Sequence, residues 1–227
     1  MIAPGQTSRP DFPRFGLPRY ATRFPSRPSS RALSVTVPGA APFTLADALS
    51  GLPRTTLRAD FHCVSTWSRL GLVWGGVRFA DLFERRLAPA TSDRGGIVDA
   101  LLQGQDGYRT TLPLDDLLAD DVLIADELDG RPLDIAHGAP LRLVAPRHYG
   151  YKSLKHLSAI ELRTSARPVK HGPLAFLDHP RARVALEERG RWFPGWLLRR
   201  LYRPMIPGTA ARFRAALIEH ERRSSRP

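Results

Sequence analysis

The spacing of apolar positions in this chain changes once, near residue 163. Before that point, short apolar runs alternate with polar residues and are separated by turn signals, as in strands and hairpins. Asp106-Gly107 and Asp129-Gly130 are hairpin dipeptides within this part. After it, apolar residues follow helical spacing in segments bounded by Pro or Gly. We therefore predict an α+β protein with a mixed or antiparallel sheet core and a helical C-terminal extension.

The same pattern predicts individual elements and three regions. Strands are expected in ALSVTVPG, TTLRADFHCVST and LSAIELRT, with a helical turn at 113–118 between hairpins. Helical segments are expected in FTLADALSGLP, with Thr44 as N-cap, and in GGVRFADLFERRLAP, with Val77, Leu82 and Phe83 facing inward. Three more are expected in HPRARVALEERG, GWLLRRLYRP and TAARFRAALIEHERR. The regions are an extended, non-helical Pro/Arg-rich arm (1–31), a core domain (32–163) and a basic helical extension (164–227).

Charge separates the ends of the chain from its middle. The net charge of +12 comes from 34 Lys and Arg against 22 Asp and Glu in 227 residues. Residues 1–31 hold six Arg and one Asp, residues 32–162 hold thirteen basic and sixteen acidic residues, and residues 163–227 hold fifteen and five. A net acidic middle argues against a nucleic-acid groove through the domain, so no nucleic-acid partner is expected.

The basic ends instead suit contact with an anionic surface. We expect the tail aromatics to pack on the domain with Arg outward; the alternative is an amphipathic anchor on anionic lipid, near a membrane electron carrier. No apolar run is long enough to cross a bilayer, and the first residues lack the apolar stretch of a secretory signal. The expected location is the cytoplasm. A peripheral position at the membrane, through contact of the C-terminal helices, is the alternative.

Cys63 is the only cysteine. A single thiol excludes a disulfide framework within the chain, a Cys-rich zinc or iron–sulfur site, and covalent haem attachment. Taken alone, Cys63 fits a small buried hydrophobe or a soft metal ligand. No helical His-Glu-x-x-His or His pair accompanies it, so a metal at this thiol would have one protein ligand and would be carried by an organic cofactor.

A second informative stretch, HGAPLRLVAPRHYGYKSLKHLSAIEL, covers residues 137–162 and is rich in basic residues. In Lys-Ser-Leu-Lys (152–155) two amines, a hydroxyl and backbone N–H groups share one turn, which can cradle a phosphate. The stretch is not a Walker loop, and a solvated basic turn is the alternative interpretation.

These two stretches together resemble the molybdopterin-binding domain of the sulfite oxidase family. The similarity is to the bacterial branch that includes the catalytic subunit of the periplasmic methionine-sulfoxide reductase. FHCVSTWS…LVWGGVRFADLF and the 137–162 stretch carry the resemblance, which runs from about residue 12 to about residue 163. It implies a sulfite-oxidase-type fold and a molybdenum–molybdopterin cofactor, with Cys63 as the thiolate ligand to molybdenum. It also implies that the pterin and its phosphate are held by His137, Arg142, Ser153, Leu154 and Lys155.

The chain departs from the family pattern in two places. His137 replaces an Asn of the related reductase subunit, and the segment Pro10 to Arg14 lacks the Asn and Tyr-Glu pair of relatives. A further polar contact of relatives falls near Gln103, where the correspondence is loose. Arg14 or backbone groups could replace the missing N-terminal contacts.

The resemblance implies an enzyme: a molybdopterin-dependent oxidoreductase that transfers an oxygen atom, in the manner of sulfite oxidases or sulfoxide reductases. The substrate would be a small oxyanion or an S- or N-oxide. A cytochrome or a quinone-linked haem protein would be the separate redox partner. Cys63, Tyr108 and His148 are the predicted catalytic residues; His62, Arg109, Arg147 and Tyr149 are further candidates near the substrate. The alternative is a non-catalytic domain that keeps the fold and binds an anion or a membrane partner.

Overall fold

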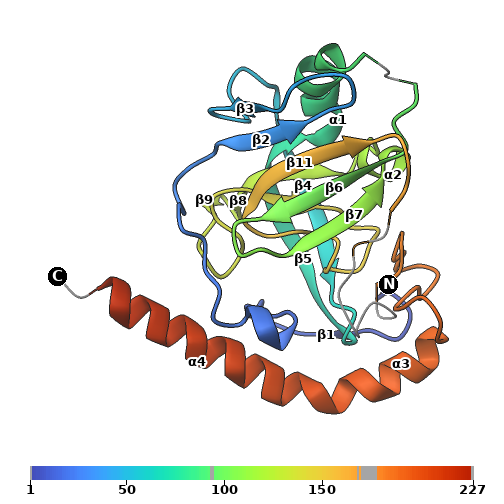
Figure 1. The fold of residues 1–227 in the computed structure, drawn as a ribbon. Helices are drawn as coiled ribbons and strands as arrows, with labels where there is room; N and C mark the ends of the chain where they lie inside the picture. Colours follow the sequence, from blue (N-terminus) through green and yellow to red (C-terminus); the bar gives the residue numbers. More distant parts are fainter. Residues whose placement is uncertain (1, 93–94, 168, 170–177, 226–227) are drawn as a thin grey trace.

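The computed structural model describes residues 2–92, 95–167, 169 and 178–225. Two sheets form the body of the molecule (Figure 1). The first has the strand order β1 (Thr7–Ser8), β5 (Trp67–Arg78), β8 (Leu123–Leu128) and β10 (Arg142–Val144). In addition, β4 (Arg54–His62) pairs with β5 and β9 (Arg131–Pro132) pairs with β8. Long antiparallel pairing of β4 with β5 makes a hairpin whose turn carries Cys63.

The second sheet has the order β3 (Phe43–Leu45), β2 (Leu33–Thr36), β11 (Leu157–Arg163), β6 (Asp99–Gly104) and β7 (Arg109–Pro113). Strand β2 runs parallel to β11 and β1 runs parallel to β5, whereas the other pairs are antiparallel. Both sheets are therefore mixed, and the α+β class predicted from the sequence is confirmed.

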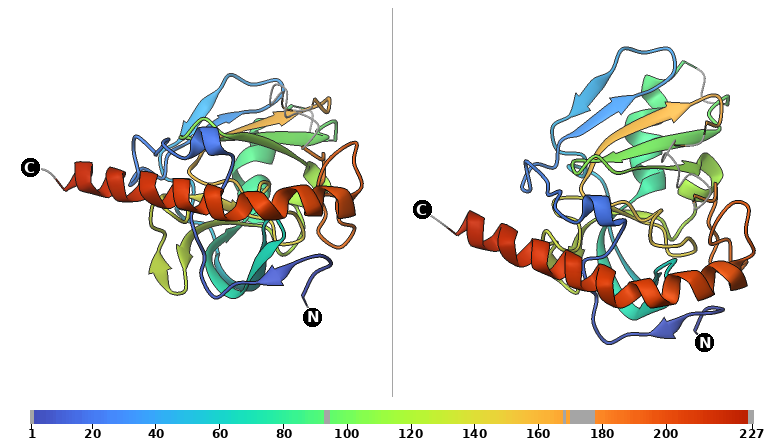
Figure 2. Two further views of the ribbon diagram at one scale, coloured as in Figure 1. Left: turned by 90° about the horizontal axis from the view of Figure 1, so that it is seen from below. Right: turned by 60° about the horizontal axis from the view of Figure 1, so that its bottom comes forward.

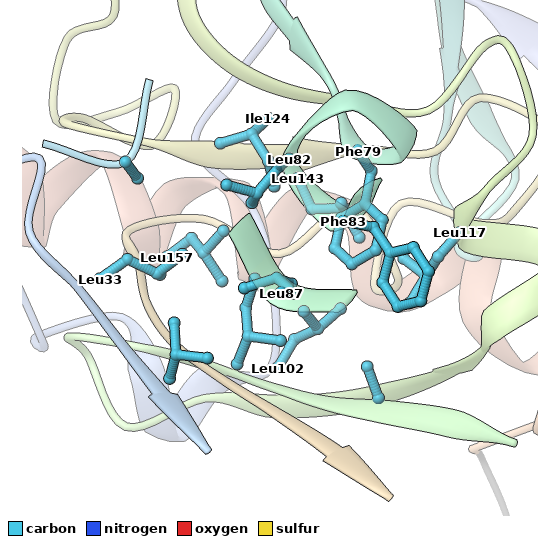
Figure 3. Close-up of a cluster of buried hydrophobic side chains, with 14 of the residues drawn as sticks. Leu33, Phe79, Leu82, Phe83, Leu87, Leu102, Leu117, Ile124, Leu143 and Leu157 are labelled. Atoms are coloured by element: carbon cyan, nitrogen blue, oxygen red, sulfur yellow. The ribbon is translucent and has the colours of Figure 1, made fainter. Parts of the chain in front are cut away.

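The main core lies between the two sheets and is closed by a short helical segment. That segment consists of α1 (Phe79–Leu82), a π-helical turn η2 (Phe83–Leu87) and a 3-10 turn η3 (Ala88–Ala90). Strand β2 contributes Leu33 and Val35 while its alternate residues face outward, as a half-buried strand requires. Figure 3 shows the side chains from both sheets, from the helical segment and from α2 (Leu114–Leu117) meeting in one cluster: Leu33, Phe79, Leu82, Phe83, Leu87, Leu102, Leu117, Ile124, Leu143 and Leu157.

Several predicted elements are confirmed, including both Asp-Gly turns, the helical turn near 113–118 and the last strand. Three predictions are wrong. FTLADALSGLP is not helical: Thr44 is no N-cap but lies in β3 opposite Ser34 of β2, because the neighbouring strand satisfies its backbone. Val77 belongs to β5, and the helix starts only at Phe79.

The third wrong prediction is the helix in HPRARVALEERG, where the structure has turns. The Glu188 carboxylate accepts hydrogen bonds from the backbone N–H and the guanidinium of Arg183, and Arg183 forms a bridge with His148. These tertiary contacts use the groups that a helix would have paired internally.

The N-terminal residues 2–31 are mostly extended, but they include a 3-10 turn, η1 (Pro18–Tyr20), which corrects the prediction that no helix forms there. They are not a free arm, because β1 pairs with β5 and Arg14 and Ala21 are buried. The domain boundaries at 31 and 163 stay predictions, and residues 168 and 170–177 of the predicted extension lie outside the described residues.

At the other end, α3 (Gly195–Tyr202), a 3-10 turn η5 (Arg203–Met205) and α4 (Ile206–Ser224) form a long, nearly continuous rod that crosses one side of the body (Figures 1 and 2). Two of its side chains, Leu198 and Phe213, are buried. The expectation that the tail aromatics pack on the domain is confirmed for Phe213 and wrong for Trp192 and Trp196, which are 71% and 53% exposed. Within the described residues no helix combines the length and apolar character that a membrane span needs.

Candidate cofactor site

The sole cysteine lies in the tight turn between β4 and β5. The Cys63 N–H donates to the Trp67 carbonyl (2.8 Å), and the Cys63 carbonyl accepts from the N–H of Thr66 (3.1 Å), whose φ of 81° closes the turn. From the N-terminal segment, Gln6 Nε2 donates to the same carbonyl (3.1 Å). The residue is 7% exposed, and it is absent from the three buried apolar clusters found in the described residues. Its position is therefore fixed by polar contacts rather than by packing alone.

The electrostatic surroundings of the thiol are mixed. Burial raises the pKa of Cys63 to about 11, and hydrogen bonds from Ser65 together with the charges of Arg189 and Lys155 oppose that shift. At neutral pH the thiol therefore keeps its proton. A metal cation that binds the sulfur would displace this proton, since thiolate is the ligating form.

Arg189 brings the C-terminal segment to this turn. Its guanidinium donates to the carbonyl of Val64 (2.7 Å) and to those of Pro4 (3.2 Å) and Gly5 (3.3 Å), and it lies 4.8 Å from the centre of the Tyr149 ring. The side chain is completely buried. The sequence analysis missed this residue, because nothing in a basic tail distinguishes one arginine that folds back from those that stay in solvent.

Arg142, on β10, is the second centre of the site and is also completely buried. It donates to the carbonyls of His137 (2.7 Å) and Ser153 (3.2 Å), and its guanidinium lies 4.8 Å from the Trp74 ring. Its Nε has no protein partner, and burial lowers the pKa of Arg142 to about 9.

Lys155 lies within electrostatic range of two arginines, Arg142 and Arg14. Lys155 donates to the carbonyl of Ala136 (2.8 Å), and burial together with Arg142 and Arg14 lowers its pKa to about 7. Arg14 donates to the carbonyl of Arg23 (2.7 Å), and burial lowers its pKa to about 10. Gly138 packs against both Arg142 and Lys155, where a Cβ would come within 3.2 Å of each at a φ of 114° that favours glycine.

We call Arg14, Arg142 and Lys155 the cationic group. None of the three forms an ion pair with a carboxylate in the part of the chain that the structure describes. The acid that interacts with both Lys155 and Arg14 is Asp106, and burial raises its pKa. Buried cations without an ion-paired carboxylate are costly, so the group suits an anion from outside the chain.

The remaining predicted cofactor contacts lie beside this group, but their polar atoms are used within the protein. The Ser153 hydroxyl accepts from the N–H of Ala145 (3.1 Å), and the Leu154 N–H donates to the Lys152 carbonyl (2.9 Å). His137 uses one ring nitrogen on the Phe12 carbonyl (2.8 Å) and the other on Asp134 (2.8 Å). Its ring therefore anchors the N-terminal segment, and its carbonyl positions Arg142. Cofactor contact by these residues stays a prediction.

The prediction that Lys152 and Lys155 both contribute amines to a phosphate site at this turn is wrong for Lys152. Lys152 points away from the cationic group: its ammonium donates to Asp178 (3.2 Å) and to the carbonyl of Thr111 (3.0 Å) and is completely buried there. Lys155 alone supplies an amine to the site from this turn.

A small hollow adjoins Arg142 and brings together two histidines from separate parts of the chain. It is lined by Asp60, Phe61, His62, Trp74, Arg142, Val144, Pro146, His148 and Ser153. One ring nitrogen of His62 is hydrogen-bonded to the Ser68 hydroxyl (2.7 Å), and His148 Nδ1 donates to the carbonyl of Arg181. Burial lowers the pKa of both histidines, so each is neutral at pH 7.

The other candidates do not line this hollow. Tyr108 donates through its hydroxyl to the Tyr151 carbonyl (3.0 Å), and burial raises its pKa far above the usual range. Arg147 is exposed and paired with Asp121, Arg109 is exposed on β7, and Tyr149 lies under Arg189. Gln103 lines a different hollow. Across the described residues no group of three or more His, Cys, Asp or Glu side chains could hold a metal ion.

Comparison with known proteins identifies a family whose model matches most of this chain. The model of the oxidoreductase molybdopterin binding domain matches residues 22–170. The uncharacterized oxidoreductase YuiH of Bacillus subtilis is 40% identical over 120 residues, which cover 53% of this chain and 58% of that protein. The protein-methionine-sulfoxide reductase catalytic subunit MsrP of Xanthomonas axonopodis pv. citri is 31% identical over 131 residues, which cover 53% of this chain and 39% of that protein. The chain thus spans about half the length of the curated relatives it matches.

Among solved structures, the sulfane dehydrogenase SoxCD from Paracoccus pantotrophus superposes with a TM-score of 0.54 and 21% identity, over 65% of this chain and 41% of that chain. That likeness shows a common fold and confirms the predicted fold type. Cys63, Arg142 and Lys155 fall inside the matched residues 22–170, whereas Arg14 and Arg189 fall outside them.

Proposed function

The chain belongs to the oxidoreductase molybdopterin binding domain family, and from this premise we propose that it is a molybdenum-cofactor-dependent oxidoreductase with Cys63 as its protein ligand to the metal. When bound, the molybdenum–molybdopterin cofactor supplies the two-electron change and the oxygen-atom transfer. The protein supplies a positioned thiolate, an anion site for the cofactor phosphate, and a restricted entrance for substrate.

One observation carries the proposal: the single thiol and the unpaired cationic group share one buried region. The charge of Lys155 acts on Cys63 and the charge of Arg142 acts on Lys155, so the amine lies within electrostatic range of both residues. A phosphate on Arg142 and Lys155 would neutralise cations that the described part of the chain leaves without carboxylates. The orphaned Nε of Arg142 and its fork of donors suit that ligand. The residues present therefore fit the cofactor.

The hollow beside Arg142 leaves no room for a water molecule in this structure, and it is the proposed substrate entrance once its lining side chains move apart. His62 and His148 line it as neutral imidazoles, which can donate or accept a hydrogen bond without adding charge. With Arg142 at its base, the hollow favours a small oxyanion or an S- or N-oxide. Tyr108 lies outside the hollow, so the proposal gives it no part in catalysis. Electrons would pass to a separate redox protein, such as a cytochrome or a quinone-linked haem protein.

The test is metal and pterin content of protein purified from a host that makes the cofactor. We expect about one molybdenum per chain, as for a single-thiolate site. Cys63→Ser should change the visible absorption of the bound centre and abolish turnover, while pterin stays bound. Arg142→Met should lower pterin retention by about a hundredfold, because losing a buried charge contact costs about 2–5 kcal/mol.

Arg147→Met is the matched control, since this neighbouring arginine is exposed and paired with Asp121. Protein that purifies without molybdenum from such a host would support the non-catalytic anion-binding domain instead. An unchanged absorption spectrum in Cys63→Ser would reject the cysteine as ligand even if the family cofactor is present.

A further inference from the structure

Exposed large hydrophobic side chains gather in one short part of the chain. Nine such side chains occur in the described residues, and six of them lie between residues 186 and 205. The most exposed are Trp192 (71%), Leu186 (60%), Leu201 (56%) and Met205 (56%). Isolated exposed apolar residues are ordinary, but a concentration of this kind marks an interaction surface.

The same part of the chain carries charge of one sign. From residue 189 to residue 218 there are seven Arg and no Asp or Glu. Arg189 is buried at the Cys63 turn and Arg199 pairs with Glu187, whereas Arg191, Arg200 and Arg203 are exposed among the aromatic residues. We call the exposed set the basic aromatic surface: Arg191, Trp192, Trp196, Arg200, Leu201, Arg203 and Met205.

The rod is held to the body of the molecule by a few buried contacts. Leu198 of α3 is 1% exposed and Phe213 of α4 is 3% exposed. The Phe213 ring stacks with Phe15 at 6.3 Å and lies 5.0 Å from the guanidinium of Arg14. Further along, the His220 ring stacks on Phe24 at 3.9 Å. The rod is therefore attached to the N-terminal segment, which runs beside it (Figure 2), while Trp192 and Trp196 stay exposed in the folded protein.

We infer that the basic aromatic surface docks on the surface of a bilayer that contains anionic lipid. Tryptophan favours the boundary between headgroups and acyl chains, and arginine can bury its stem there while the guanidinium stays at the phosphates. Anionic lipid supplies the opposite charge that the stretch 189–218 lacks. Because none of the described helices can span a membrane, the rod would lie on the surface rather than cross it.

Two other occupants fit less well. A second copy of the chain would place the same arginines against each other, since this stretch has no carboxylate to offer and the chain carries a net charge of +12. An acidic protein would match the charge, but α3 and α4 form a long rod along one side of the body (Figure 1), which suits a flat bilayer. Arg189 joins the start of this surface to Val64, so docking would bring the Cys63 turn near the membrane.

Vesicle binding of the full chain tests the inference, and the result does not depend on cofactor content. We expect co-sedimentation with vesicles of phosphatidylcholine containing about a third phosphatidylglycerol, little with phosphatidylcholine alone, and weakening by salt. Trp192→Ala with Trp196→Ala should weaken binding by at least about tenfold, given the area that aromatic side chains bury. Arg200→Gln with Arg203→Gln should weaken it by about fivefold per arginine, as expected for cations at an anionic membrane.

Matched controls use exposed residues elsewhere on the molecule. Val98→Ala removes an apolar side chain that is 45% exposed, and Arg78→Gln with Arg85→Gln removes two exposed charges. These variants should bind as the unaltered chain does. Three results would overturn the inference: no binding to protein-free anionic vesicles, binding that the surface variants leave unchanged, or self-association that those variants abolish. Binding only to membranes that retain their proteins would assign the surface to an acidic protein.

Discussion

Two basic regions of this molecule look alike in composition and differ in environment. Two members of the cationic group, Arg14 and Arg142, are buried and Lys155 is half-buried, so all three have lost water without forming an ion pair with a carboxylate in the described structure. The basic aromatic surface keeps its arginines in solvent. The first region is costly to the folded protein and would be stabilised by the anion proposed to occupy it, whereas the second costs little and is available to a large partner. Burial, and not the number of basic residues, separates a cofactor site from a docking surface.

The contrast repeats on a smaller scale within one turn. Lys152 and Lys155 are three residues apart, yet Lys152 is buried against Asp178 and Lys155 lies next to other cations. One lysine is part of a buried ion pair that holds the turn against β7, because Lys152 also donates to Thr111. The other is a cation kept without a carboxylate. The two should therefore respond in opposite ways to removal of their charge.

Lys152→Met is expected to have the largest effect on stability. It leaves Asp178, whose side chain is 10% exposed, without its cation. Breaking a buried pair in this way costs about 3–5 kcal/mol in the free energy of unfolding. Urea denaturation of the cofactor-free variant measures this loss, and Lys152→Met combined with Asp178→Leu should recover most of it. A variant as stable as the original chain would remove the distinction between the two lysines.

The sequence predicted most of the sheet framework, because alternation and Asp-Gly turns act locally. It failed where tertiary contacts decide the local structure: Thr44 pairs with a neighbouring strand, and Glu188 diverts its segment from a helix. For the site, Cys63, Arg142 and Lys155 could be proposed from motifs and resemblance. Arg14 could be proposed only as a substitute for missing N-terminal contacts. Arg189 could not be proposed, since its burial depends on segments from opposite ends of the chain meeting at the Cys63 turn.

The exposure of the tail aromatics could not be predicted from the sequence either. Helical spacing predicts that one face of a helix is apolar, but α3 has a single buried side chain, Leu198, while Trp196 and Leu201 stay outside. The pattern of hydrophobic positions shows which residues could be buried. Whether these residues are in fact buried depends on what packs against the helix, and here that is a short N-terminal segment.

A pH dependence should distinguish Lys155 from Lys152. The folded-state pKa of Lys155, about 7, is below its unfolded value of 10.5, so between these values the unfolded chain binds the extra proton. The stability of the cofactor-free protein should therefore rise with pH from about 7 to about 10.5, by less than about 1.4 kcal/mol per pH unit because the side chain is only half-buried. Lys155→Met should remove this part of the slope in urea denaturation.

Measuring the same pH dependence of stability with cofactor bound gives a sharper test. A phosphate beside the amine would keep Lys155 charged in the folded protein, and its contribution to the slope between about pH 7 and about pH 10 should flatten. The same slope in the original chain and in Lys155→Met would mean that this amine is solvated, and the cationic group would then lose one of its three members.

The smallest effect on stability is expected from an exposed ion pair whose charged atoms lie closer together than those of the buried Lys152–Asp178 pair. Arg223 and Glu219 are 2.8 Å apart on α4, closer than the 3.2 Å between Lys152 and Asp178. Their side chains are 75% and 51% exposed, however, so water screens the pair and already solvates each charge. Glu219→Gln should therefore change the free energy of unfolding by no more than about 0.5 kcal/mol, measured in the same urea titration. A loss above about 1 kcal/mol would show that charges on the exposed rod stabilise the fold, and the separation between a buried region that needs an anion and a solvated region that is free to dock would not hold.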